Sequence, residues 1–107
     1  MNTSIESLVT AVLSELDKEI ITKLQKWGKI VQLYIDGVPY YIKFELEPLE
    51  LKEGEINTSD FSISSSLTTF QGILNGDIQP VEAVVSGEVV IDGSLTTALE
   101  FSEMIQN

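Results

Sequence analysis

The chain has 107 residues and a formal net charge of −11 at pH 7, and it contains no Cys, His or Arg. Those absences exclude disulfides, thiol nucleophiles, zinc–thiolate and histidine metal sites, and guanidinium clamps for phosphate. All six Lys lie between Lys18 and Lys52, whereas residues 53–107 carry nine acids and no base, a distribution that repels nucleic acids and anionic membranes.

The first predicted element is a helix over residues 3–27. Thr3 and Glu6 have capping-box spacing, apolar residues then recur with a 3.6-residue period, and Gly28 ends the helix. About 24 residues is long for a globular helix, so a break near Asp17–Lys18 fits the pattern. The apolar stripe indicates core packing; the alternative is that residues 20–24 wall a ligand cavity.

Three strands follow, over residues 29–35, 40–47 and 49–52, and they are predicted to form an antiparallel meander with one exposed face. Asp36-Gly37 is a strong hairpin turn between the first two. In the first strand, Val31, Leu33 and Ile35 share one face, and Gln32 belongs to the other. In the second strand, the alternation predicts two faces. The side chains that face the core are Tyr40, Ile42, Phe44 and Leu46, and those that face water are Tyr41, Lys43, Glu45 and Glu47.

The second half of the chain alternates strands and helices. Residues 61–64 have the period-2 pattern of a strand, and Ser66 is the expected N-cap of a helix that Gly76 ends. A short helix begins at Pro80 and ends before Gly87, and residues 89–91 form the last strand. Residues 94–106 are predicted to form a terminal helix with apolar side chains on more than one face. This helix must therefore contact the sheet and a second body, which is a ligand, a dimer mate or a membrane.

Catalytic chemistry is not indicated. Glu45, Glu47 and Glu50 cluster, but carboxylates on an exposed strand face are usually solvated and untuned. No loop has the alternating acids of a calcium site. We therefore expect that the protein is not an enzyme, has no catalytic residue and binds neither a metal nor a cofactor.

In the second half of the chain, the spacing of Gly, Pro, Ser and apolar residues matches a known sequence pattern without a gap. The thirteen matching positions are Asp60, Phe61, Ile63, Ser66, Phe70, Gly76, Ile78, Pro80, Val84, Gly87, Val89, Ile91 and Gly93. This order resembles the sterol carrier protein type 2 family, also called non-specific lipid-transfer proteins. Ser65 and Gln79 depart from the pattern, because the family commonly has an apolar residue and Asn or Asp there, but neither changes the spacing.

The resemblance implies an α+β fold over residues 1–107 as one domain: a five-stranded, mainly antiparallel sheet with helices on one face. It also implies an apolar tunnel between sheet and helices that holds a sterol, fatty acyl or isoprenoid-type lipid. Carried over to this sequence, the tunnel would be lined by Phe61, Ile63, Phe70, Ile73, Leu74, Val81, Val84, Val85, Leu95, Leu99 and Met104. Ser65 and Thr69 could offer a hydroxyl to the lipid head, and the terminal helix is the expected gate.

Two function classes remain open at this point. The first is a lipid-binding or lipid-carrier module, working alone or with a lipid-handling partner enzyme. The second is a non-catalytic interaction module that pairs through its terminal helices, for example as a homodimer. The sequence shows no signal peptide and no apolar run of the roughly 18–20 residues that cross a membrane. We therefore expect a cytoplasmic protein without an integral membrane segment.

Overall fold

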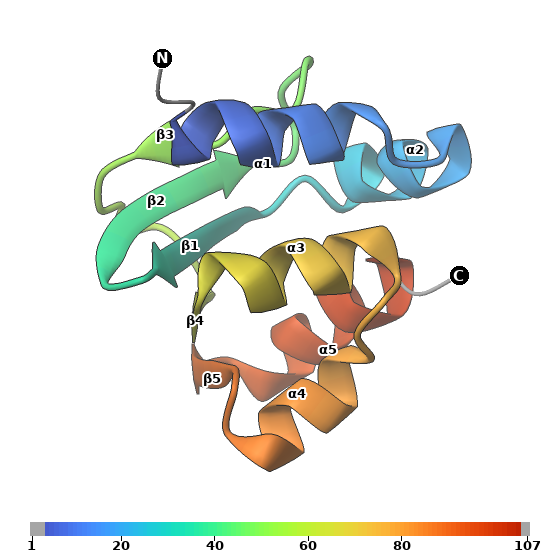
Figure 1. The fold of residues 1–107 in the computed structure, drawn as a ribbon. Coiled ribbons are helices and arrows are strands. Elements are labelled where there is room, and N and C mark those ends of the chain that lie inside the picture. Colours follow the sequence, from blue (N-terminus) through green and yellow to red (C-terminus); the bar gives the residue numbers. More distant parts are fainter. Residues whose placement is uncertain (1–3, 106–107) are drawn as a thin grey trace.

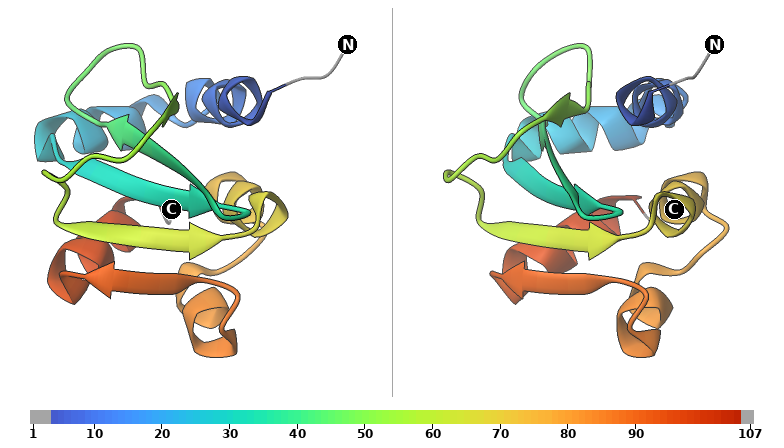
Figure 2. Two further views of the ribbon diagram at one scale, coloured as in Figure 1. Left: turned by 90° about the vertical axis from the view of Figure 1, so that its left-hand side faces the viewer. Right: turned by 60° about the vertical axis from the view of Figure 1, so that its left-hand side comes forward.

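A computed structural model describes residues 4–105 and has helices on one face of a five-stranded sheet (Figure 1; Figure 2). The elements are α1 (Ile5–Ser14), α2 (Lys18–Trp27), β1 (Ile30–Ile35), β2 (Val38–Lys43), β3 (Lys52–Glu53), β4 (Phe61–Ser65), α3 (Leu67–Asn75), α4 (Pro80–Ser86), β5 (Val90–Gly93) and α5 (Leu95–Ile105). The strand order is β3-β2-β1-β4-β5, with β1–β4 parallel and the other pairs antiparallel. The predicted fold class is confirmed.

The long first helix predicted from the sequence is two helices, α1 and α2. The side chain of Asp17 accepts a hydrogen bond from the N–H of Glu19 at 2.8 Å and begins α2, as an N-cap residue does. At the start of α1 the N-cap is Ser4, whose hydroxyl accepts from the N–H of Ser7 at 3.1 Å. The predicted cap, Thr3, lies outside the described residues.

The core lies between the sheet and the helices, and most of the residues expected to be inside are buried. They are Val31, Leu33, Ile42, Phe44, Phe70 and Val89, each no more than 4% exposed. Lys43 is only half-buried and Glu45 is exposed, as the one-sided covering of the sheet requires. The Asp36-Gly37 turn is confirmed as well, because Ile35 pairs with Val38 across it.

The second strand is shorter than predicted, and the prediction for Leu46 is wrong. β2 ends at Lys43, and the N–H of Leu46 donates to the carbonyl of Lys43 at 3.2 Å, which closes a turn. Leu46 is consequently 48% exposed. The third strand is also displaced, to Lys52–Glu53. Alternation in a sequence shows which face each residue would take, but it does not show where the ladder stops.

The assignment of Gln32 to an open sheet face is a second error, because this side chain is buried. Its Nε2 donates to the carbonyls of Tyr40 at 2.7 Å and Gly54 at 3.2 Å, and its Oε1 accepts from the N–H of Ile56 at 2.7 Å. The segment after β3 therefore crosses this face. A buried amide is tolerated there because its hydrogen bonds are made.

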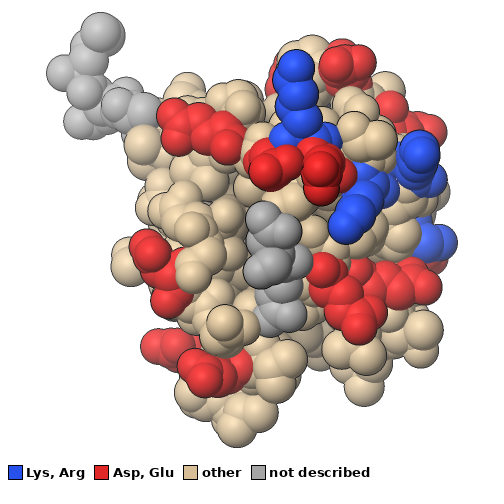
Figure 3. All heavy atoms as spheres, turned by 90° about the vertical axis from the view of Figure 1, so that its right-hand side faces the viewer, with Lys and Arg blue, Asp and Glu red and all other residues tan. Residues whose placement is uncertain are grey.

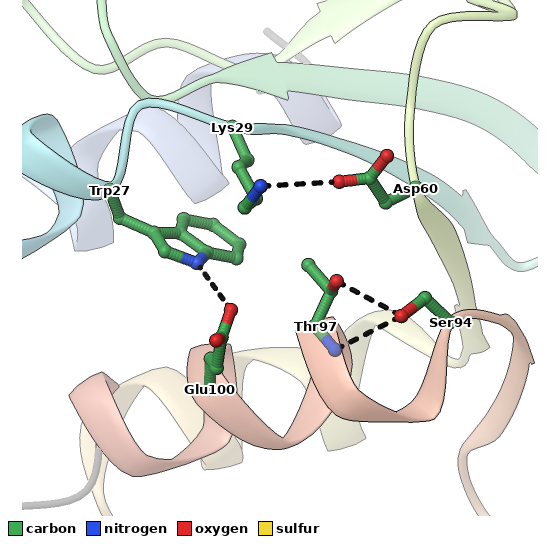
Figure 4. A network of polar contacts seen from close by, with 6 residues as sticks. All are labelled: Trp27, Lys29, Asp60, Ser94, Thr97 and Glu100. Carbon is green, nitrogen blue, oxygen red and sulfur yellow. Dashed lines mark hydrogen bonds and ion pairs between the residues drawn. The ribbon is translucent and has the colours of Figure 1, made fainter.

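An aromatic cluster fixes α5 against the rest of the fold. The ring of Phe101 lies 5.7 Å from Trp27, 5.5 Å from Phe44 and 6.2 Å from Phe61, measured between ring centroids. The indole Nε1 of Trp27 also donates to the carboxylate of Glu100 at 3.2 Å (Figure 4). The cluster connects four parts of the chain at one point: α2, the residue directly after β2, the strand β4 and the helix α5.

A side-chain cap holds the beginning of α5. The hydroxyl of Ser94 accepts from the N–H of Thr97 at 3.2 Å (Figure 4). Nearby, Lys29 and Asp60 form an ion pair at 3.5 Å (Figure 4). This pair is partly exposed to water and contributes little stability.

Candidate ligand cavity

An apolar cavity of about 330 Å³ lies among β4, β5, α3, α4 and α5. Of the described residues that line it, all are apolar except Ser102: Phe61, Ile63, Phe70, Ile73, Pro80, Val81, Val84, Val85, Val89, Ile91, Leu95, Ala98, Leu99, Phe101, Ser102 and Ile105. Local chemistry explains this arrangement. The strand places Phe61 and Ile63 on one face, and Pro80 and Gly87 limit α4 to two turns whose valines face the cavity.

Nine of the eleven side chains that the sequence nominates for ligand contact lie around this cavity. They are Phe61, Ile63, Phe70, Ile73, Val81, Val84, Val85, Leu95 and Leu99. The structure therefore brings together residues from β4, α3, α4 and α5. That these residues contact a ligand stays a prediction.

The other two nominated side chains lie elsewhere. Leu74 lines a second hollow at the end of α3, and Met104 packs against the core. Met104 follows Leu99 by five residues, which turns it roughly 140° around the helix axis and away from the cavity. Ser65 and Thr69 do not line the cavity either: the Ser65 hydroxyl donates to the Ser66 carbonyl, and the Thr69 hydroxyl accepts from the Ser66 hydroxyl.

Sequence reasoning missed several side chains of the cavity wall. Those not nominated are Pro80, Val89, Ile91, Ala98, Phe101, Ser102 and Ile105. A usable signal existed for α5, because residues three, seven and ten positions after Leu95 share its side of the helix. For β5 the signal was the period of two, because Ile91 lies two residues after Val89 and shares its face; in the structure Ile91 pairs with Ile63.

The cavity opens to solvent through a mouth of exposed aliphatic side chains on α4 and α5. The exposed fraction is 82% for Val85, 70% for Leu95, and 56% for both Val81 and Leu99. These residues belong to the cavity wall and to the surface at once. A clustered apolar surface of this kind marks a site where a ligand or partner binds.

That α5 is the gate stays a prediction, and burial differs between α5 and α4. Phe101 and Ile105 are buried, and Phe101 occupies the centre of the aromatic cluster. By contrast, α4 buries only Ala83 of its seven residues. The element with fewer buried contacts opens at lower cost, so α4 is the better candidate for movement at the mouth.

Hydrogen exchange distinguishes the two helices. We expect the amides of residues 84–86 in α4 to exchange about tenfold or more faster than those of residues 101–105 in α5, which corresponds to about 1.4 kcal/mol in opening free energy. Amides in the first turn of either helix are left out, because they have no partner within the helix. Equal protection of the two segments would mean that α4 is not the looser element.

The ionisable side chains of the described residues show no metal-binding cluster and no activated base. Within residues 4–105, no group of three or more acidic side chains is placed to hold a metal ion. Burial raises the pKa of Tyr40, and the carboxylates of Glu6 and Glu53 raise it further. Desolvation and the nearby Glu55 carboxylate likewise raise the pKa of Tyr34. Both phenols are therefore protonated at neutral pH and unsuited to act as a base.

The comparison with protein families decides what kind of domain this is. A model described as the SCP-2 sterol transfer family matches residues 10–106. The chain belongs to this family. No curated protein sequence is significantly similar to it, and none of the described helices is both long and apolar enough to cross a bilayer.

Solved structures with low sequence identity share the fold of this family member. The sterol carrier protein domain 2 of Helicoverpa armigera is 16% identical with a TM-score of 0.70; the match covers 98% of this chain and 90% of that one. Palmitated SCP2L2 from Aedes aegypti is 16% identical with a TM-score of 0.59, with 84% and 94% covered. The alkylsulfatase Pisa1 from Pseudomonas sp. is 14% identical with a TM-score of 0.74, but this chain spans only 17% of its length.

Proposed function

We propose that this domain is a non-catalytic lipid carrier that holds a sterol, fatty acyl or isoprenoid-type lipid in the apolar cavity. The observation that carries the proposal is the cavity itself, about 330 Å³ with Ser102 as the one polar residue among the described lining residues. Removing an alkyl chain from water there gains roughly 25 cal/mol for each Å² buried. Membership of a sterol transfer family and the palmitated relative support the same class of ligand.

The proposal is tested by binding of a fluorescent fatty acid or sterol and by native mass spectrometry of the purified protein for retained lipid. We expect the wild-type protein to bind an apolar probe at micromolar concentration. Absence of binding by every apolar probe at that concentration would remove the carrier proposal.

The substitution Val84→Asp should weaken this binding by about tenfold or more, because a carboxylate placed in the cavity wall must lose hydration when a lipid enters. Val84 is 44% exposed, so the fold should tolerate the charge. The matched control is Val90→Asp: Val90 is 58% exposed and does not line the cavity. An equal loss of affinity in both variants would place the probe outside the cavity.

A second candidate function rests on the exposed mouth. Val85 and Leu95 are 82% and 70% exposed. Exposed apolar side chains that cluster mark interaction sites, which suits a module that pairs with another chain, either a second copy or a lipid-handling enzyme. Sedimentation with and without a bound fatty acid separates the two functions. A monomer that binds the probe favours the carrier, whereas a dimer that excludes the probe favours the interaction module.

A further inference from the structure

A second hollow adjoins the apolar cavity. It has a volume of about 680 Å³ and lies between the α1–α2 junction, the end of α3, the α3–α4 connection and the last turn of α5. The described residues that line it are Val12, Glu15, Leu16, Asp17, Ile20, Ile73, Leu74, Asn75, Gly76, Ile78, Gln79, Pro80, Glu103 and Ile105.

The two spaces share part of their walls. Ile73, Pro80 and Ile105 line the apolar cavity and the second hollow alike. A side chain that contacts both spaces leaves at most one layer of side chains between them. Both Ile73 and Ile105 are buried, so a passage between the two spaces requires these side chains to take other staggered rotamers.

The polarity of the two spaces differs in the way that an amphiphile requires. The apolar cavity offers Ser102 as its one polar side chain among the described lining residues. The second hollow is lined by apolar side chains, by Asn75 and Gln79, and by the exposed carboxylates of Glu15, Asp17 and Glu103. No lysine is among the described residues that line it. On the face drawn in Figure 3, lysines gather in one region while acidic side chains occupy several others.

We infer that the second hollow receives the polar head of the ligand and selects a single-chain lipid whose head is uncharged or cationic. This inference rests on the proposed carrier function. A cavity of about 330 Å³ lies at the small end of ligand pockets, which run from about 300 to 1,000 Å³, and it therefore suits the tail of one chain. The head then lies beside carboxylates that attract an ammonium group, tolerate a hydroxyl and repel a carboxylate or a phosphate.

The test compares three amphiphiles with one dodecyl chain: dodecyltrimethylammonium, tetraethylene glycol monododecyl ether and dodecanoate. Each is titrated below its micelle concentration against a bound fluorescent probe, at about 0.01 M salt, where charges act over about 30 Å. We expect the affinity to fall from the cation through the neutral ether to the anion. The net charge of −11 favours the same order of affinities wherever the head lies. Variants are therefore needed to show whether the preference arises at the second hollow.

The decisive variant is Glu15→Gln with Glu103→Gln, which neutralises two carboxylates of the second hollow. Asp17 is left unchanged because it caps α2. The control, Glu45→Gln with Glu53→Gln, removes the same charge from two exposed side chains that line neither space. The variants are compared at about 0.15 M salt, where charges act over only about 8 Å. Under that condition we expect the first variant to lower the cation-to-anion affinity ratio about threefold or more and the control less than about twofold, because the control charges lie outside both spaces.

A second measurement does not depend on any variant. In the wild-type complex, the trimethylammonium protons should show nuclear Overhauser effects to the methyl groups of Val12 and Leu16 in the second hollow, and not to those of Val85 and Leu99 at the mouth. Head-group contacts at the mouth would overturn the inference, and so would equal effects of the two double variants. Either result leaves the carrier proposal standing, whereas failure of all three amphiphiles to bind wild-type protein would remove both.

Discussion

Substitution of Phe44 by Ala is expected to lower the free energy of unfolding by about 3–5 kcal/mol. The side chain is 1% exposed, and its ring lies 5.9 Å from that of Trp27 and 5.5 Å from that of Phe101. Truncation removes the contacts of the ring with both neighbours and leaves a cavity where α2, α5 and the end of β2 meet. Packed surroundings of this kind collapse only partly into such a space.

Leu46→Ala is the matched control, since it removes an apolar side chain two residues further along. Leu46 is 48% exposed, so its loss should change stability by no more than about 0.5 kcal/mol. Denaturant titrations of both variants measure the difference. A loss below about 1 kcal/mol for Phe44→Ala would show that the aromatic cluster is not a tightly packed core.

The aromatic cluster also bears on how a ligand could enter. Phe101 lines the apolar cavity while it packs against Trp27 and Phe44, so its helix cannot swing away without breaking the core. Truncating the chain after Glu100 should therefore unfold the domain rather than loosen the cavity. The two-turn α4, which buries Ala83 alone, leaves the other wall free to adjust.

Local patterns predicted much of this fold. Helix ends were predictable because caps act over a few residues: Asp17, Ser66 and Ser94 begin helices with side-chain hydrogen bonds to nearby N–H groups, and Gly28 ends one with a φ of 64°. The buried face of β2 was predictable as far as Phe44 for the same reason. A period of two over five residues specifies one face of a strand.

What the sequence did not predict depends on contacts between distant segments. The buried position of Gln32 depends on hydrogen bonds to Gly54 and Ile56, more than twenty residues along the chain. The second hollow depends on segments from opposite ends of the chain, because Glu15 and Glu103 both line it. Periodicity within one element contains no information about such pairings.

Gly93→Ala is expected to be about as damaging as the loss of the Phe44 ring, although it only adds a methyl group. Gly93 has a φ of 103°, in the region that residues with a Cβ rarely adopt. A Cβ at this position would lie 2.7 Å from the carbonyl oxygen of Asp60 and 2.9 Å from the Cα of Phe61. Both are backbone atoms, so they cannot be relieved by a side-chain rotation.

The matched control is Gly37→Ala in the β1–β2 turn, where φ is 84° and no atom lies within 4 Å of the added Cβ. The control should lower the free energy of unfolding by about 1–2 kcal/mol, from backbone strain alone. In Gly93→Ala the steric displacement adds about 1–3 kcal/mol to the same strain, so the total loss should be roughly 2–5 kcal/mol. Gly93 is the last residue of β5, next to α5, and the displaced atoms belong to Asp60 and to Phe61 at the start of β4. Since Phe61 lines the cavity, the variant should also weaken binding of an apolar probe. Equal destabilisation of the two variants in a denaturant titration would show that β4 and β5 can separate at this point without loss.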